Sequence, residues 1–87
     1  KPENQPQVID AIAAQIEAGD DRIMGVMVES NLVAGRQDLV PGKPLVYGQS
    51  ITDGCIDWDT SVAVLDRLAA AVEARRRVLG GKSTAAA

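Results

Sequence analysis

The apolar residues near the start of the chain recur with the period of an α-helix. Those that set the spacing, at intervals of three and four, are Val8, Ile9, Ile12 and Ile16. Residues spaced in this way lie along one face of a helix. Pro6 suits the first turn, where its missing N–H group costs nothing, and Gly19 suits the position after the helix end, because glycine readily adopts the left-handed conformation. The pattern therefore predicts a helix over residues 6–18.

Residues 23–28 form a short, continuous apolar run that contains Gly25. Its neighbours on both sides are polar, as expected of a strand that is buried on both faces. In the following segment, 31–57, the periodicity is lost and glycine and proline recur. A stretch this long without regular structure is uncommon in compact domains and is often functional. We predict one buried strand followed by a long loop, with a brief extension at residues 50–52.

A second helix is predicted to begin at Asp57 or Asp59, either of which can cap it, and to end at Gly80. Its expected core stripe comprises Val62, Leu65, Ala69 and Val72, widened by Val64 and Leu68. Three arginines at 75–77 fall in its last turns, where positive charge favours the helix dipole. The order helix, strand, long loop, helix over residues 1–81 is typical of the α/β class.

Composition narrows the possible functions. The 87-residue chain has no Phe, one Trp, one Tyr and a net charge of −3, so aliphatic residues must build the core and nucleic-acid binding is disfavoured. Its longest apolar run is far shorter than the ~20 residues of a membrane span. One cysteine cannot form an internal disulfide, which fits a reducing cytosol. The chain begins with Lys1, so we expect its natural start to be missing, and residues 82–87 are expected to form a frayed tail.

Two carboxylates are candidates for a functional site. Glu29 directly follows the predicted strand, and ligands of parallel α/β folds and barrels bind at the carboxyl ends of strands. Asp53 precedes Gly54, and glycine lets the backbone approach a ligand closely. The alternatives are a solvated turn for Glu29 and a common Asp-Gly turn for Asp53. Two carboxylates on neighbouring loops are a plausible partial shell for Mg²⁺ or Mn²⁺, and a thiolate or imidazole from elsewhere would shift the preference towards Zn or Fe.

The other residues that could carry chemistry give weaker signals. Cys55 has no histidine to activate it, because the chain contains none, and its neighbour Ile56 favours a buried structural thiol. The same lack means that these residues alone cannot complete a His-containing triad or a His-ligated metal site. Arg22, Arg36 and Lys43 could contact phosphate, but solvated charge is the simpler interpretation of each.

Two separate motifs resemble the C-terminal end of class I 3-deoxy-D-arabino-heptulosonate-7-phosphate (DAHP) synthases. Residues 25–33 read GVMVESNLV and are followed by GRQ at 35–37, whereas residues 47–58 read YGQSITDGCIDW. The likeness continues into the last predicted helix and covers residues 6–76. Because both motifs occur in the order and at the distance that the family has, the resemblance is specific.

The resemblance implies the C-terminal portion of a (β/α)₈ TIM barrel, to which this chain contributes helix seven, strand eight, the following loop and helix eight. It also implies a cytoplasmic, homo-oligomeric transferase that performs the first step of the shikimate pathway and so opens aromatic amino-acid biosynthesis. Such an enzyme condenses phosphoenolpyruvate with erythrose 4-phosphate to give DAHP and phosphate. The family holds a divalent metal of the Mn, Fe, Co or Zn class with a Cys, a His, a Glu and an Asp.

Residue by residue, the resemblance assigns two of these ligands to the chain. Glu29 matches the glutamate ligand. Asp53 matches the aspartate ligand and is also implied to be a catalytic residue that binds the aldehyde substrate. The cysteine and histidine ligands belong to upstream segments, so Cys55 is not the metal-binding cysteine. Many bacterial relatives have His at the position of Asn31, to which we assign no ligand role.

The chain alone is expected to be inactive, because a complete barrel requires about 250 residues. The alternative is a small, non-enzymatic α+β interaction module whose binding surface is the loop at residues 31–48.

Overall fold

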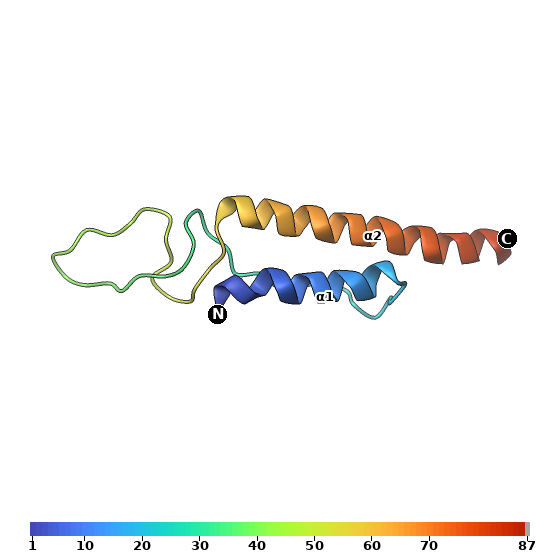
Figure 1. The fold of residues 1–87 in the computed structure, drawn as a ribbon, viewed down its shortest axis with the longest axis horizontal. Coiled ribbons are helices and arrows are strands. Elements are labelled where there is room, and N and C mark those ends of the chain that lie inside the picture. The colour runs from blue at the N-terminus through green and yellow to red at the C-terminus, as the bar shows by residue number, and fades with distance from the viewer. Residues whose placement is uncertain (87) are drawn as a thin grey trace.

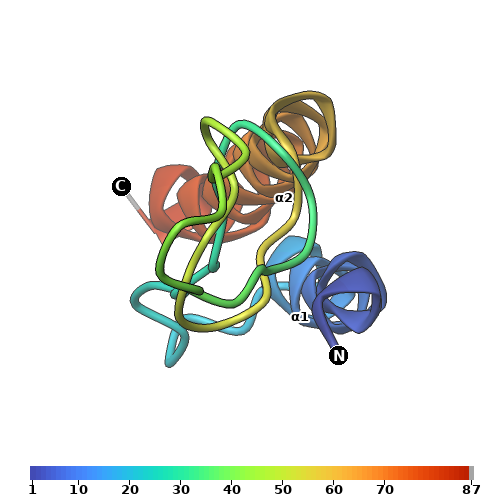
Figure 2. The same ribbon diagram turned by 90° about the vertical axis from the view of Figure 1, so that its left-hand side faces the viewer.

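Two long helices dominate the fold. The structure, a computed structural model, describes residues 1–86, with side chains described for residues 1–80. A short 3-10 helix, η1 (Pro2–Asn4), leads into α1 (Gln5–Glu17), and α2 (Trp58–Ala86) follows a long connection. The two helices lie side by side and run in the same direction (Figure 1), and the end-on view shows the connecting loop beyond their first turns (Figure 2). Within the described residues, neither helix is long and apolar enough to cross a membrane.

The first helix follows the sequence prediction closely. Pro6 stands at the beginning of α1, as predicted. Gly19 follows the helix end with φ of +106°, so the left-handed turn expected there is confirmed. Ile9, Ala13 and Ile16 of this helix are buried. Of the predicted apolar stripe, Ile9 and Ile16 are buried and Ile12 packs against them, whereas Val8 is exposed.

Asp57 is the residue that caps α2. Its Oδ1 atom accepts a hydrogen bond from the backbone N–H of Thr60 at 2.8 Å, which satisfies one of the free donors at the helix start. Hydrogen bonding from the side chain and then the backbone of Thr60 lowers the pKa of Asp57 below its usual value. Of the two caps that the sequence left open, the structure selects Asp57.

The predicted end of this helix at Gly80 is wrong. The helix continues through Gly80 and Gly81 to Ala86, because each glycine inside a helix costs only about 1 kcal/mol relative to alanine. The predicted frayed tail thus begins in residues whose backbone is helical, and its last residue, Ala87, lies outside the described residues.

The core is the seam between the two helices. Its buried residues form two clusters, namely Ile9 with Ile56 and Val64, and Ala13 with Ile16 and Ala71. The predicted stripe of α2 is only partly right. Val64 is buried, and Leu68 and Val72 pack against these clusters. In contrast, Val62, Leu65 and Ala69 are exposed. Apolar residues occur on several faces of this helix, so their spacing could not show which face meets α1.

Charged side chains join the helices at the edge of this seam. Arg67 of α2 donates two hydrogen bonds to the carboxylate of Glu17, both at 3.0 Å, and a third to Asp10 at 3.1 Å. A guanidinium matches a carboxylate in this two-bond geometry, which fixes orientation as well as distance. These partly exposed ion pairs join α1 and α2 beside the apolar seam.

Arg75 has a different role from the one the sequence suggested. Its Nη1 atom donates to the backbone oxygens of Asp20 and Ile23, at 3.0 and 2.8 Å, so it holds the turn after α1 and does not serve the end of α2. In the same turn, hydrogen bonds from Arg22 to the Asp20 carboxylate lower the pKa of Asp20 to about 2. Arg22 remains exposed, as expected of a solvated charge, and it also pairs with Asp20.

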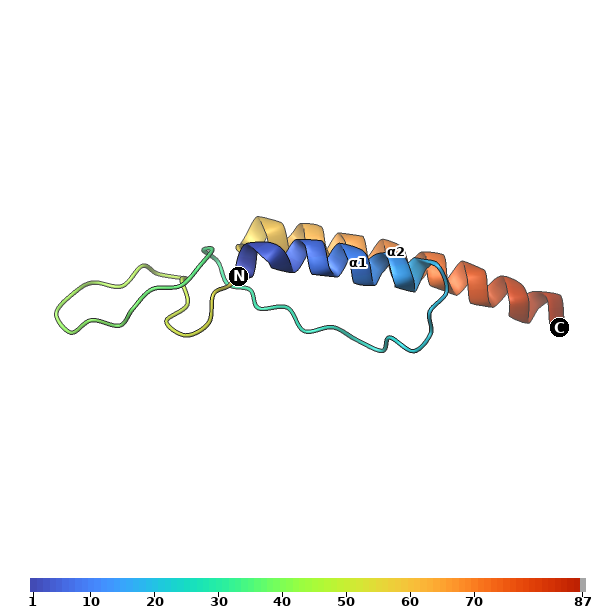
Figure 3. The ribbon, with the colours of Figure 1, turned by 60° about the horizontal axis from the view of Figure 1, so that its bottom comes forward.

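The segment at residues 23–28, which the sequence predicted as a buried strand, is extended but is not a strand in this structure. It returns along the helix pair towards the beginning of α1 (Figure 3). Within the described residues, the backbone of 24–28 makes no hydrogen bond, and Met24 and Met27 are 96% and 88% exposed. A strand exists only through hydrogen bonds to a neighbouring strand, and this part of the chain contains no such neighbour. The predicted burial on both faces is likewise not met.

The long loop is held by backbone and side-chain hydrogen bonds, in agreement with its predicted lack of regular structure. Isolated bridges join Ser30 to Ile56, Gly35 to Cys55 and Arg36 to Ser50. The side chain of Gln37 also donates to the backbone oxygens of residues 46 and 49 and accepts from the N–H of residue 46, at 2.8 to 2.9 Å. The two ends of the loop are therefore tied to each other.

Candidate metal site

Glu29 and Asp53, the two predicted metal ligands, line the same hollow. Its volume is about 490 Å³. It is bounded by Lys1, Pro2, Gln5, Glu29, Asp53 and Gly54. The hollow lies where the first turn of α1 meets the two ends of the long loop. Residues that are distant in sequence thus come together at one place, although the structure does not test their roles as ligands.

The backbone of Glu29 is held from two sides. Its carbonyl oxygen accepts a hydrogen bond from the N–H of Ile56 at 3.0 Å and another from Nε2 of Gln5 at 3.0 Å. Its N–H group donates to Oε1 of Gln5 at 2.9 Å. These bonds hold the backbone of Glu29 in place. Its side-chain carboxylate makes no hydrogen bond within the described residues.

Asp53 is held by the residues that follow it. Cys55 exchanges two backbone hydrogen bonds with Gly35, at 2.8 and 3.1 Å, which fixes the segment that carries Asp53. A Cβ atom on Gly54 would lie 2.9 Å from the ring of Pro2, so glycine is needed there for the loop to pass close to η1. The sequence predicted that this glycine lets the backbone approach a ligand, whereas the close approach in the structure is to Pro2 on the wall of the hollow.

The side chains in this hollow fit part of a divalent metal shell. Both carboxylates supply oxygen ligands of the kind that such cations take. Within the described residues, however, no group of three or more His, Cys, Asp or Glu side chains could hold a metal ion. The two carboxylates of the hollow are therefore candidate ligands only, and a complete shell would need further ligands from elsewhere.

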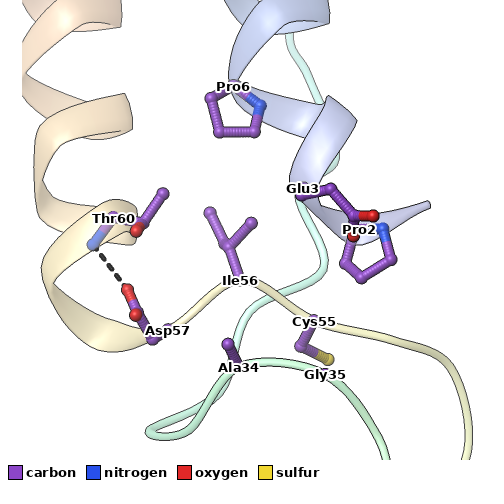
Figure 4. A pocket seen from close by; sticks show the side chains of 9 residues that line it. All are labelled: Pro2, Glu3, Pro6, Ala34, Gly35, Cys55, Ile56, Asp57 and Thr60. Carbon is purple, nitrogen blue, oxygen red and sulfur yellow. Dashed lines mark hydrogen bonds between the residues drawn. The ribbon is translucent and has the colours of Figure 1, made fainter.

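A second hollow of about 400 Å³ lies between the beginnings of α1 and α2 (Figure 4). Ile56 points into the gap between Pro6 and Thr60, and Cys55 lies beside Gly35. The thiol of Cys55 is buried and lies 3.5 Å from the backbone oxygen of Asp53. The prediction of a buried thiol at this position is confirmed.

Sequence reasoning missed three polar residues that organise the region. Gln5 pairs with the backbone of Glu29, and Gln37 ties the loop together. Arg36, expected to be solvated, donates to the backbone oxygen of Thr52 at 2.8 Å through Nε. For Arg36 and Gln37, the only signal was their place in the GRQ triplet at residues 35–37. For Gln5 there was none, because its partner is 24 residues away in sequence.

Comparison with known proteins identifies the class to which this arrangement belongs. Residues 1–66 match the model of the DAHP synthetase I family. Since this match covers more than half of the chain, the chain belongs to the DAHP synthetase I family.

Individual relatives agree with this assignment. The chain is 55% identical over 83 residues to a phospho-2-dehydro-3-deoxyheptonate aldolase of Alternaria alternata, covering 93% of this chain and 22% of that protein. It is 53% identical over 72 residues to the Phe-sensitive enzyme of the same name from Escherichia coli K12, covering 83% of this chain and 21% of that protein. The chain thus spans about a fifth of the length of these curated relatives.

A solved structure shares the fold of this segment. The phospho-2-dehydro-3-deoxyheptonate aldolase of Francisella tularensis SCHU S4 superposes with a TM-score of 0.80 at 50% sequence identity, over 87% of this chain and 22% of that chain. The arrangement of two helices and a long loop is therefore a segment of the DAHP synthase structure.

Proposed function

We propose that this chain is the part of a DAHP synthase that supplies Glu29 and Asp53 to a divalent metal site. The complete enzyme condenses phosphoenolpyruvate with erythrose 4-phosphate to give DAHP and phosphate. The observation that carries the proposal is that both carboxylates line one hollow of about 490 Å³, although 24 residues separate them in the sequence.

In this proposal the chain forms the C-terminal portion of a (β/α)₈ barrel. Residues 23–28 become its eighth strand once neighbouring strands pair with their backbone. Two features support this assignment. The exposed side chains of Met24 and Met27 would be covered by adjacent parts of the barrel, and the parallel course of α1 and α2 is the arrangement of successive helices around such a barrel.

The shape of the chain favours this segment over an independent interaction module. Its radius of gyration is 17.5 Å, whereas a compact domain of this length would have a radius of gyration of about 12 Å. A small module would also bury its large apolar side chains, many of which are exposed here. The chain has the form of a piece that packs against other structure.

The residues of the site would divide the chemistry among them. When bound, the metal supplies Lewis-acid polarisation of the aldehyde carbonyl. Glu29 and Asp53 provide negative charge that balances the cation and fix its position in the hollow. In this proposal Asp53 also orients the aldehyde substrate. The backbone bonds around both residues hold them in place before the substrate arrives, so little reorganisation is needed during the reaction.

The test replaces each carboxylate by its amide in the complete enzyme. We expect Glu29→Gln and Asp53→Asn each to weaken Mn²⁺ binding, measured by calorimetry, by more than the roughly 10–100-fold that follows from changing an outer-shell partner. Turnover should fall in parallel.

Asp21→Asn is the matched control, because Asp21 is exposed and does not line the hollow. Its metal affinity should equal that of the unmodified enzyme. Unchanged metal affinity in both Glu29→Gln and Asp53→Asn would reject the ligand assignment.

A further inference from the structure

We propose that Gln5 is a positioning residue for Glu29. Its side-chain amide forms two hydrogen bonds with the backbone of Glu29. These bonds set the position of the Glu29 carboxylate in the hollow that Glu29 and Asp53 both line. The inference rests on the proposed function, because it assigns Gln5 a task only if Glu29 binds the metal.

The two bonds form a closed pair. Oε1 of Gln5 accepts from the N–H of Glu29 at 2.9 Å, and Nε2 donates to the carbonyl oxygen of Glu29 at 3.0 Å. An amide side chain carries one acceptor and donors on the same planar group, so it satisfies both backbone groups of one residue as a neighbouring strand would. Within the described residues, Gln5 is the sole partner of the Glu29 N–H group.

The position of Gln5 suits it for this task. It is the first residue of α1, and the same helix buries Ile9 one turn later against Ile56 of the loop. Ile56 in turn donates its N–H to the oxygen of Glu29 at 3.0 Å. The backbone of Glu29 is thus hydrogen-bonded by Gln5 of α1 on one side and by Ile56 of the loop on the other. These two segments pack against each other through Ile9 and Ile56.

A direct role of Gln5 as a metal ligand is the weaker interpretation. Its side-chain oxygen is held by the Glu29 N–H group at 2.9 Å, so only the second lone pair of this oxygen could reach a cation, and the amide nitrogen is a poor metal ligand because its lone pair is delocalised. Gln5 also lines the hollow, so an effect of its replacement on the metal would act at short range. We therefore expect it to act through Glu29.

The test uses the complete enzyme and Co²⁺ alone, whose visible absorption spectrum reports the geometry of its ligands. Gln5→Met keeps the length of the side chain and removes both hydrogen bonds. We expect it to weaken Co²⁺ binding by roughly 10–100-fold, the range for residues that orient metal ligands, and to change the absorption spectrum of the bound ion. The melting temperature of the metal-free protein should change little.

Gln7→Met is the matched control. Gln7 is exposed, lies in the same first turns of α1 and makes no side-chain hydrogen bond within the described residues. Its Co²⁺ affinity and spectrum should equal those of the unmodified enzyme. Gln5→Asn is the second variant, because its amide is one methylene shorter and cannot form both bonds to Glu29. It keeps the polarity of the site and replaces Gln5→Met if that protein does not fold.

The outcomes separate this inference from the proposed function. If Gln5→Met or Gln5→Asn folds and binds Co²⁺ with normal affinity and spectrum, while Glu29→Gln weakens binding, the positioning role is wrong and the ligand assignment stands. A lower melting temperature without a change in the Co²⁺ spectrum would likewise overturn it, because Gln5 would then be purely structural. If Glu29→Gln itself leaves Co²⁺ binding unchanged, the proposed function fails.

Discussion

At Gly48 the long loop turns with φ of +83°, a conformation that side chains other than that of glycine rarely adopt. A Cβ atom at this position would also lie 2.8 Å from Cβ of Leu32. The neighbouring backbone is joined by a bond from the N–H of Val33 to the oxygen of Gly48 at 3.0 Å. Both the positive φ and the contact with Leu32 therefore require glycine at position 48. This is the place where residues 33 and 48 are joined by a backbone hydrogen bond.

We predict that Gly48→Ala destabilises the loop of the complete enzyme more than Gly42→Ala does. Gly42 has the same kind of φ, +81°, but nothing lies within 4 Å of a Cβ atom placed there. Both variants incur the conformational cost of about 1–2 kcal/mol. Only Gly48→Ala adds a steric cost, of about 1–3 kcal/mol. Urea unfolding and limited proteolysis of the loop would measure both, and equal losses in the two variants would contradict the close contact with Leu32.

Single residues also show where sequence reasoning stopped. Glu29 and Asp53 were found from motif and position, because their neighbours in sequence carry the signal. Gln5 was not found, because its partner Glu29 is 24 residues away and comes near only in the folded chain. The sequence around residue 5 carries no sign of this contact. Gln5 illustrates a general limit, since a side chain that bonds to distant backbone leaves no local pattern.

At the scale of elements, the two helices were predictable because the information that makes them is local. Hydrogen bonds within a helix join residues four apart, and apolar spacing, Pro6, Gly19 and the cap at Asp57 all act within one turn of their effect. The segment at 23–28 was different. Its sequence favours an extended backbone, but strand formation depends on hydrogen bonds with a neighbour, and these are not available within the described residues.

The cap of α2 makes the stability of this helix depend on pH. The pKa of Asp57 is lower in the folded chain than its ordinary value, so its contribution to stability is present above about pH 4 and is lost as the pH falls through the folded pKa. We predict that the melting temperature of the complete enzyme falls as the pH is lowered below about 4, and that Asp57→Asn has a shallower dependence. Asparagine keeps an oxygen that can cap the helix but does not titrate.

Asp57→Ala separates capping from charge in this experiment. It removes the acceptor for the Thr60 N–H group, so its melting temperature should already be lower at neutral pH, measured by circular dichroism. Asp20 titrates near pH 2 and contributes equally to all three proteins. Identical pH profiles of the unmodified protein and Asp57→Asn would contradict the role of the Asp57 charge.

At the scale of the whole molecule, the chain is long and thin, with principal extents of 66, 17 and 16 Å. Its core is confined to the seam between the helices, and large apolar side chains of the extended segment, the loop and α2 remain exposed. The free energy gained by burying apolar surface is roughly proportional to the area removed from water. A chain with so little buried area gains little stability of its own.

We predict that the isolated chain self-associates and melts without a sharp cooperative transition, measured by analytical ultracentrifugation and circular dichroism. A combined Met24→Lys and Met27→Lys variant should associate less, because charge replaces exposed apolar surface. In the complete enzyme the same variant should fold poorly, since the lysines would be buried among neighbouring elements. A monomeric isolated chain with a cooperative melt would support an independent module instead.

The sequence by itself determined the two helices, the loop, the buried thiol and the family, because helical spacing and motifs of adjacent residues are local properties of a chain. The tertiary structure decided which face of α2 packs, how far that helix extends, and that Glu29 and Asp53 share one hollow with Gln5 beside them. These features depend on contacts between residues far apart in sequence, and such contacts are fixed only when the folded chain brings the residues together.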